Sequence, residues 1–266
     1  MPRRHLHIDA AKVLASHLIV LHHLTVYGPL AYALDLAAPR LTDFFFEYAR
    51  MAVQVFLVIG GYFSASSLAP HGHLQFSHLI RRVGRRYVRL VLPFSVALLL
   101  VIAGSAVARG ALQSEFIPAA PGLWQLLAHA GLVQGVLGVE PLSIGIWYVA
   151  IDFQLYVLMA FLLWLGGRQA QWLVALVALV ALASLLVFNL QADGDNWAPY
   201  FFGAYGMGAF AWWAGHSRQA GLRLAALAGV GILALLWDFR LRILLALAVA
   251  LWLGFARGRI ARDEAA

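Results

Sequence analysis

The sequence contains no cysteine, and only 12% of its 266 residues are charged. The absence of cysteine excludes disulfide bonds, cysteine-ligated zinc and thiol catalysis. So few charged residues cannot cover a water-soluble domain, in which about a quarter of the residues are charged. Hydrophobic residues instead make up 63% of the chain. The composition therefore predicts a protein embedded in a lipid bilayer.

Long hydrophobic runs predict an all-α, polytopic membrane helix bundle that forms one integral-membrane domain, residues 1–266. One crossing needs about 20 mostly apolar residues, which gives about eight transmembrane helices. The expected spans are residues 10–28, 50–69, 89–107, 147–165, 172–190, 198–214, 222–237 and 241–256. A ninth apolar stretch, Trp124 to Gly138, is too short to cross and carries polar His129 and Gln134. We expect a re-entrant or interfacial helix there.

Arginine is distributed unequally between the expected loops. With a cytoplasmic amino terminus, the inner segments hold Arg3, Arg4, Arg81, Arg82, Arg85, Arg86, Arg89, Arg168, Arg218, Arg223, Arg257, Arg259 and Arg262. The outer segments hold only Arg40, Arg50, Arg109, Arg240 and Arg242. Cytoplasmic loops are enriched in Lys and Arg, so we expect a protein of the cytoplasmic (inner) membrane with both termini in the cytoplasm. Topology thus explains the net charge of +7 without a nucleic-acid partner.

A cleavable signal peptide is the competing interpretation of the amino terminus. Arg3 and Arg4 precede an apolar run, and the Ala-Tyr-Ala triplet at residues 31–33 resembles a cleavage site. Three histidines interrupt that run, so we expect the segment to be retained as a transmembrane helix. These histidines are His17, His22 and His23.

The first expected span also carries Asp9 and Lys12. Ionisable residues inside a membrane are costly and usually face the protein interior, which makes them candidates for function. Lys12 and His23 are eleven residues apart, about three helical turns plus about 20° and a rise of about 16.5 Å, so they share a face. An imidazole that titrates near physiological pH is the usual general base, which makes His23 the candidate catalytic residue.

Structural roles explain the other polar residues of this span more simply. Asp9 and Lys12 can form a partly exposed pair at the membrane interface, and His17 can bond to a neighbouring helix. We favour these roles for Asp9 and His17. A metal site built from His17, His22 and His23 is disfavoured, because adjacent histidines diverge and no carboxylate cluster accompanies them. We therefore expect no metal.

A basic run precedes the third expected span. It contains Arg81, Arg82, Arg85, Arg86 and Arg89, which cluster along a helix because they are spaced by one, three or four residues. Each guanidinium offers a planar fork that suits phosphate oxygens. The run therefore predicts a phosphorylated cytoplasmic ligand. Alternatively, it serves only membrane topology and contact with anionic lipid.

Four segments, which cover roughly residues 8–160, resemble motifs of the acyltransferase family 3 membrane proteins. They are Ile8–Lys12 followed after ten residues by His23, Val55–Phe63, Phe76 with the arginine run through Pro93, and Trp147–Tyr156. The chain departs from the family pattern where Gly60 replaces the usual serine and Asp152 stands where glutamate is common. Its eight expected spans are also fewer than the family's usual ten.

The resemblance implies an acyl-CoA-dependent O-acyltransferase, with acetyl-CoA as the expected co-substrate. His23 would be the catalytic histidine that deprotonates an acceptor hydroxyl. Lys12 and the five arginines would hold the phosphates of coenzyme A, with its pantetheine arm directed toward His23. Asp152 and Tyr156, one helical turn apart, would orient His23 or an arginine, or would only bond an adjacent helix. The implied acceptor is an envelope or exported carbohydrate, with a lipid or small molecule left open.

Two other classes of function also fit the residues. A small transporter or flippase for an anionic lipid or sugar phosphate would use arginines beside a polar-lined bundle in a similar way. It would neither bind nor hydrolyse acyl-CoA. A purely structural membrane partner of an envelope assembly would tolerate replacement of His23 by alanine.

Overall fold

The computed structural model describes residues 6–26, 28–72, 79–112, 117–167 and 169–263, and these residues form an all-α bundle without strands, as predicted. The helices are α1 Leu6–Val26, α2 Gly28–Ala37, α3 Pro39–Glu47, α4 Val53–Leu68, α5 Leu79–Ala111, α6 Leu123–Ala130, α7 Trp147–Leu165, α8 Ala170–Leu186, α9 Ala198–Gly215, α10 Ala220–Trp237 and α11 Leu241–Asp263. Short 3₁₀ turns join several of them, including η2 at Ile144–Ile146.

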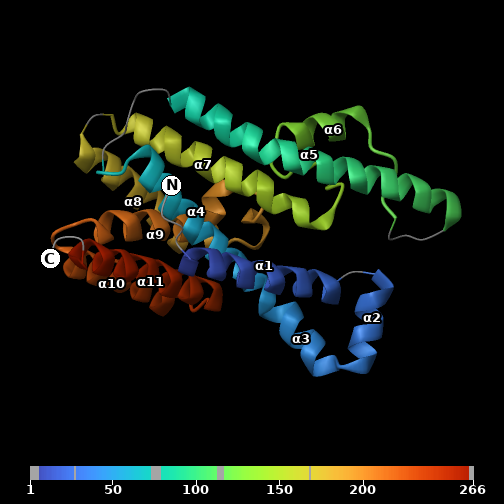
Figure 1. The fold of residues 1–266 in the computed structure, drawn as a ribbon, viewed down its shortest axis with the longest axis horizontal. Helices are drawn as coiled ribbons and strands as arrows, with labels where there is room; N and C mark the ends of the chain where they lie inside the picture. Colours follow the sequence, from blue (N-terminus) through green and yellow to red (C-terminus); the bar gives the residue numbers. More distant parts are fainter. Residues whose placement is uncertain (1–5, 27, 73–78, 113–116, 168, 264–266) are drawn as a thin grey trace.

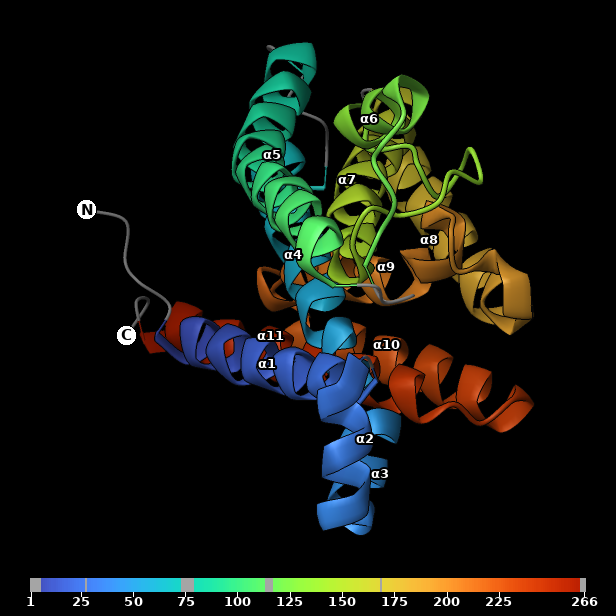
Figure 2. The same ribbon diagram turned by 90° about the vertical axis from the view of Figure 1, so that its right-hand side faces the viewer.

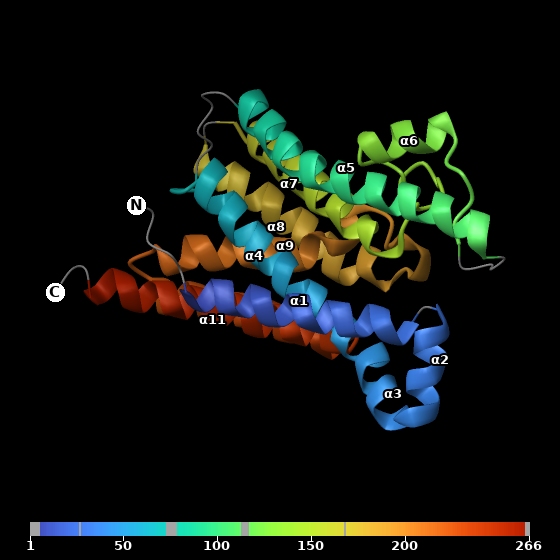
Figure 3. The same ribbon diagram turned by 45° about the vertical axis from the view of Figure 1, so that its right-hand side comes forward.

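The long helices run along a common direction, which gives the molecule two distinct ends (Figure 1). At one end α1 begins, α4 ends, α5 begins and α11 ends; we call this the basic end because it carries the arginine run of α5. At the other end lie the α2–α3 hairpin, α6 and η2, and we call this the hairpin end. Figure 3 shows the same division after a 45° turn.

Five helical segments in the described residues are long and apolar enough to cross a membrane. A sixth is added if α1 and α2, which meet at an angle of 91°, count as one broken span. The predicted number of eight is therefore not confirmed, since α9 and α11 are not among these segments. In α9, glycine and aromatic residues replace much of the leucine and valine of a lipid-facing helix, because α9 is packed among other helices.

Helix α9 is the centre of the bundle, and almost all of its side chains are buried. Helix α4 crosses it so closely that the two backbones touch: a Cβ atom on Gly208 would lie 1.9 Å from the carbonyl oxygen of Val58. A Cβ on Gly61 would lie 1.8 Å from the carbonyl oxygen of Tyr205. Only glycine permits this approach. Figure 2 shows α4 as the element that separates α1 from α5.

Gly203 and Gly206 of α9 have the same role toward α8. Added Cβ atoms there would lie 2.7 Å from the Leu185 side chain and 2.8 Å from the Cβ of Ala181. Small residues let membrane helices approach and gain van der Waals contact. These glycines therefore allow close packing on two sides of α9, with α8 as one partner and α4 as the other.

The short apolar stretch forms α6, an eight-residue helix beside α5 and α7 at the hairpin end. A second hydrophobic cluster joins it to these helices. His129, at its end, is fully buried and has a structural role. Its Nδ1 bonds to the Gln125 carbonyl at 2.7 Å, and its Nε2 accepts the backbone N–H of Leu142 at 3.2 Å. The prediction of a short helix here is confirmed, and its eight residues are too few to span a membrane.

Candidate active site

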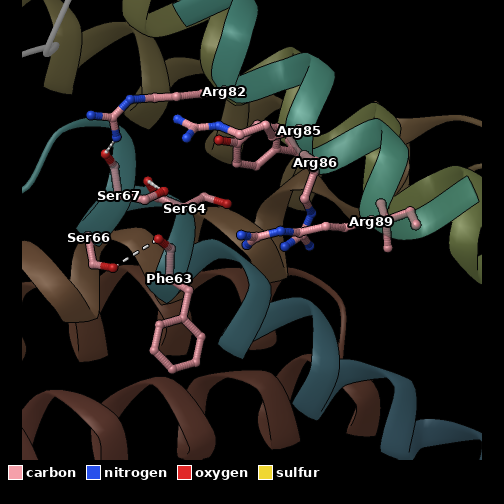
Figure 4. Close-up of a pocket in the computed structure, with 10 residues that line it drawn as sticks. Phe63, Ser64, Ser66, Ser67, Arg82, Arg85, Arg86 and Arg89 are labelled. Carbon is pink, nitrogen blue, oxygen red and sulfur yellow. Dashed lines mark hydrogen bonds between the residues drawn. The ribbon is translucent and has the colours of Figure 1, made fainter. Parts of the chain in front are cut away.

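A cavity of about 470 Å³ opens at the basic end between α4, α5 and α7. The spacing of the arginine run on α5 brings four guanidinium groups to one helical face, and Figure 4 shows them above the last turns of α4. We call this the arginine cavity. It is lined by Phe63, Ser64, Ser66, Ser67, Arg82, Arg85, Arg86, Arg89, Leu90 and Tyr156.

The arginine cavity differs in composition from the expected cluster in two ways. Arg81 is exposed and does not line it, because this residue lies outside the face that the other four share. Three serines at the end of α4, which the sequence motifs did not single out, do line it. The Ser-Ala-Ser-Ser run at residues 64–67 follows directly after the second motif and was the available signal.

Arg86 and Asp152 form an ion pair that joins α5 to α7. Nη2 of Arg86 donates a 2.6 Å hydrogen bond to Oδ2 of Asp152, whose side chain is only 8% exposed. The guanidinium also lies over the ring of Tyr156, 5.4 Å from its centroid. Of the roles considered for Asp152 and Tyr156, the geometry supports that of orienting an arginine. Arg86 is accordingly less available to a ligand than Arg85 and Arg89, while Arg82 donates a hydrogen bond to the Ser67 carbonyl.

Tyr205 of α9 closes the inner wall beside this pair. Its hydroxyl and the Ser64 hydroxyl lie 2.5 Å apart in a buried hydrogen bond. A Cβ on Gly60 would lie 3.1 Å from the Tyr205 ring and 3.5 Å from Oδ1 of Asp152. The tyrosine ring therefore fills the space beside the glycine that departs from the family pattern. No local pattern relates Tyr205 to this site, because its neighbours come from distant parts of the chain.

His23 lies away from the arginine cavity, toward the hairpin end of α1. It faces η2: a Cβ on Gly145 would lie 3.6 Å from Nε2 of His23. The neighbouring His22 points elsewhere, and its Nδ1 bonds to the backbone carbonyl of Phe45 at 3.2 Å. That contact fastens α1 to α3. The two histidines therefore occupy different environments, as their helical offset predicted.

Lys12 lies on the opposite side of α4 from the arginines and is linked to the cavity through Phe63. Its Nζ is 5.0 Å from the centroid of the Phe63 ring, which points away from the arginines (Figure 4). Asp9 lies 4.0 Å from Nζ of Lys12, and both side chains are more than one third exposed. The predicted partly exposed pair of Asp9 and Lys12 is thus present. His17 is exposed and bonds to the Val13 carbonyl of its own helix.

Phe76, part of the third motif, lies outside the described residues. Among the described residues, no three His, Asp or Glu side chains are grouped so that they could hold a metal ion.

The all-α bundle, with its apolar helices and a polar cavity lined by arginines, is that of an integral-membrane protein whose cavity has the charge to suit an anionic ligand. The chain matches the family model for the acyltransferase domain of acyltransferase family 3 over residues 5–262. It therefore belongs to this family, and the resemblance of its motifs is confirmed: it is a membrane acyltransferase. Comparison with curated proteins and with solved structures gave no match.

Proposed function

We propose that the protein transfers an acyl group, acetyl in the simplest case, from cytoplasmic acyl-CoA to a hydroxyl group of an envelope or exported carbohydrate. The observation that carries the donor half of this proposal is the arginine cavity. The acceptor half follows from the family resemblance, because such proteins acylate cell-envelope sugars and other exported acceptors. The positive-inside rule supports a cytoplasmic membrane location with the basic end and both termini in the cytoplasm.

The charges in the cavity suit the phosphates of coenzyme A. Asp152 neutralises Arg86, so Arg82, Arg85 and Arg89 retain an excess of positive charge toward the opening. Charged hydrogen bonds from guanidinium to phosphate are among the strongest in proteins. The hydroxyl groups of Ser66 and Ser67 donate to the carbonyls of Phe63 and Ser64, so these serines add a polar wall to the cavity. The volume of about 470 Å³ is within the range of small-molecule sites.

The pantetheine arm would connect this cavity to His23. His23 lies toward the hairpin end of α1, about 16.5 Å along the helix from Lys12, so the arm would run from the basic end along the bundle toward it. His23 would take the proton of the acceptor hydroxyl as its oxygen attacks the thioester carbonyl. Collapse of the tetrahedral intermediate breaks the carbon–sulfur bond, and the departing thiolate receives the proton. The products are the acyl ester and coenzyme A.

Binding of acetyl-CoA to the purified full chain tests the donor half. Wild-type protein should be thermally stabilised by acetyl-CoA, because a ligand that binds only the folded state raises its stability. Replacing Arg82 and Arg85 together by glutamine should weaken binding by about tenfold or more. Arg81→Gln is the matched control: it removes the same charge from the same helix but outside the cavity, so binding should persist.

The outcomes also separate the alternatives. If the double variant is folded and binds acetyl-CoA like the wild type, the arginine cavity does not bind the donor. If the wild type neither binds acetyl-CoA nor slowly hydrolyses its thioester, while it moves an anionic lipid across vesicles, the transporter interpretation replaces this one.

A further inference from the structure

A second cavity, of about 490 Å³, lies at the hairpin end. It is enclosed by the loop of residues 134–141, the first turns of α7 and the segment of residues 195–201. On α7, Ile151 and Gln154 face this cavity, whereas Tyr156 faces the arginine cavity. The two cavities therefore lie on different faces of the same helix. We call the second one the glutamine cavity, after Gln134 in its wall.

Gln134 is buried in the wall without hydrogen bonds for its side chain. Only 3% of the residue is exposed, and neither Oε1 nor Nε2 has a partner among the described residues. A carboxamide can donate two hydrogen bonds and accept two. Buried polar groups are nearly always satisfied, so the unsatisfied amide beside this cavity requires a partner, which a ligand or a water can supply.

The turn that presents Gln134 is held in place by its own hydrogen bonds. The Gln134 carbonyl accepts the N–H of Val139 at 2.9 Å. The Leu132 carbonyl accepts a 3.0 Å bond from Nε2 of Gln154, which fastens the turn to α7. Leu132 itself is fully buried and has a positive φ of 55°, a backbone conformation that is costly for leucine. The backbone that carries Gln134 is thus fixed before any ligand arrives.

The remaining walls suit a neutral, hydroxyl-rich ring. Trp147 and Phe201 stack with ring centroids 5.7 Å apart and form an aromatic surface. Glu140, Asp195 and Asn196 supply acceptors for hydroxyl groups. The residues that line this cavity include no arginine, lysine or histidine, in contrast to the arginine cavity. Its two carboxylates would repel an anion and accept hydrogen bonds from sugar hydroxyl groups.

We propose that the glutamine cavity binds the carbohydrate acceptor, with Gln134 as its central hydrogen-bonding group. This inference rests on the proposed acyl transfer for its biological meaning. Ile144 of η2 lines the cavity, while the next residue, Gly145, faces Nε2 of His23. Only the η2 turn separates the bound acceptor from the proposed base. Donor and acceptor would then approach His23 from opposite ends of the bundle.

Binding of neutral methyl glycosides to the purified full chain, followed by saturation-transfer NMR, tests the proposal. Methyl glucoside, galactoside, mannoside and rhamnoside serve as probes, with methyl glucuronide as the anionic comparison. At least one neutral glycoside should bind, and more tightly than the glucuronide. Gln134→Leu, which keeps the size but removes the amide, should weaken binding by about tenfold or more. The same exchange at exposed Gln219, outside the cavity, should leave binding unchanged.

Thermal stability distinguishes a binding role of Gln134 from a structural one. Because its amide is buried without partners, Gln134→Leu should leave the melting temperature unchanged or raise it. If Gln134 instead stabilised the fold, Gln134→Leu would lower the melting temperature. A lower melting temperature together with normal glycoside binding would overturn the proposal. Asp195→Asn at the exposed rim provides a second variant that does not endanger folding, and it should weaken binding several-fold.

Two further results would contradict the proposal. One is the absence of binding by all four neutral glycosides to the wild-type protein. The other is unchanged binding in both Gln134→Leu and Asp195→Asn. Acetyl-CoA binding is measured on the same samples. If the wild-type protein binds acetyl-CoA but none of the neutral glycosides, only the acceptor site is overturned. If it binds a neutral glycoside but not acetyl-CoA, only the proposed donor is overturned.

Discussion

The carboxylate of Asp152 on α7 accepts a 2.6 Å hydrogen bond from the guanidinium of Arg86 on α5. This pair joins two helices that otherwise share mainly apolar contacts, and it fixes the back of the arginine cavity. It also divides the arginines by function: Arg86 is held by a carboxylate, while Arg82, Arg85 and Arg89 face the opening. The pair is therefore a positioning element beside the proposed donor site.

Removal of one charge from this pair should destabilise the protein. Asp152→Asn leaves Arg86 partly buried without a counter-charge, and we expect a loss of about 3 kcal/mol in the free energy of unfolding. Asp152→Glu keeps the charge and should cost less than about 1.5 kcal/mol. The double variant Asp152→Leu with Arg86→Met should recover most of the loss. Thermal and denaturant unfolding in detergent measure these values, and a fully stable Asp152→Asn would contradict the structural role.

The adjacent histidines should respond differently to replacement by alanine. His23→Ala should lower acyl transfer by about 10²–10⁴-fold, because a general base acts in the transition state, and should leave acetyl-CoA binding intact. His22→Ala removes the bond to Phe45 and should cost about 1 kcal/mol of stability with little effect on transfer. Transfer assays on folded variants check both. An inactive His22→Ala beside an active His23→Ala would assign the base to His22.

Lys12 should affect the donor requirement more than the chemical step. Its ammonium group lies over the ring of Phe63, a residue that lines the arginine cavity, so Lys12→Ala should raise the acetyl-CoA concentration for half-maximal rate by about two- to fivefold. Lys12→Arg keeps the charge and the contact with the ring and should restore part of the affinity. A fall in the maximal rate at saturating acetyl-CoA would instead place Lys12 in the chemistry.

The contact between α4 and α9 should not tolerate a single methyl group at Gly208. A Cβ there would lie 1.9 Å from the Val58 carbonyl, so Gly208→Ala must separate the helices and should cost about 3 kcal/mol or more. Gly229→Ala is the matched control, because α10 has open space at that position. Helix propensity should make it neutral or stabilising by up to about 1 kcal/mol. Equal melting temperatures for the two variants would contradict the close packing.

The topology can be tested directly because the chain has no cysteine of its own. Single cysteines at exposed positions Tyr32 and Asp193 should react with an impermeant maleimide on intact cells, since both are expected outside. A cysteine at exposed Arg218 should react only after permeabilisation. Labelling of the Arg218 position on intact cells would reverse the proposed orientation and place the arginine cavity on the outer side.

The sequence alone determined the features that depend on local composition and periodicity. Apolar length predicted helices in a membrane, and the spacing of the α5 arginines predicted their common face. The eleven-residue interval between Lys12 and His23 likewise set their offset along α1. The number of transmembrane helices could not be predicted as well. Composition does not distinguish a helix that faces lipid from one that, like α9, is enclosed by other helices.

Only the tertiary structure decided which helices meet and which side chains face one another. The pairing of Arg86 with Asp152 spans 66 positions, and that of Ser64 with Tyr205 spans 141. Nothing in the local pattern specifies such partners: the first pair follows from the packing of α5 against α7, and the second from the close crossing of α4 and α9 that the glycines allow. The sequence also does not predict the unsatisfied amide of Gln134, because glutamine is usually exposed and nothing near it in the chain indicates that it is buried beside a cavity.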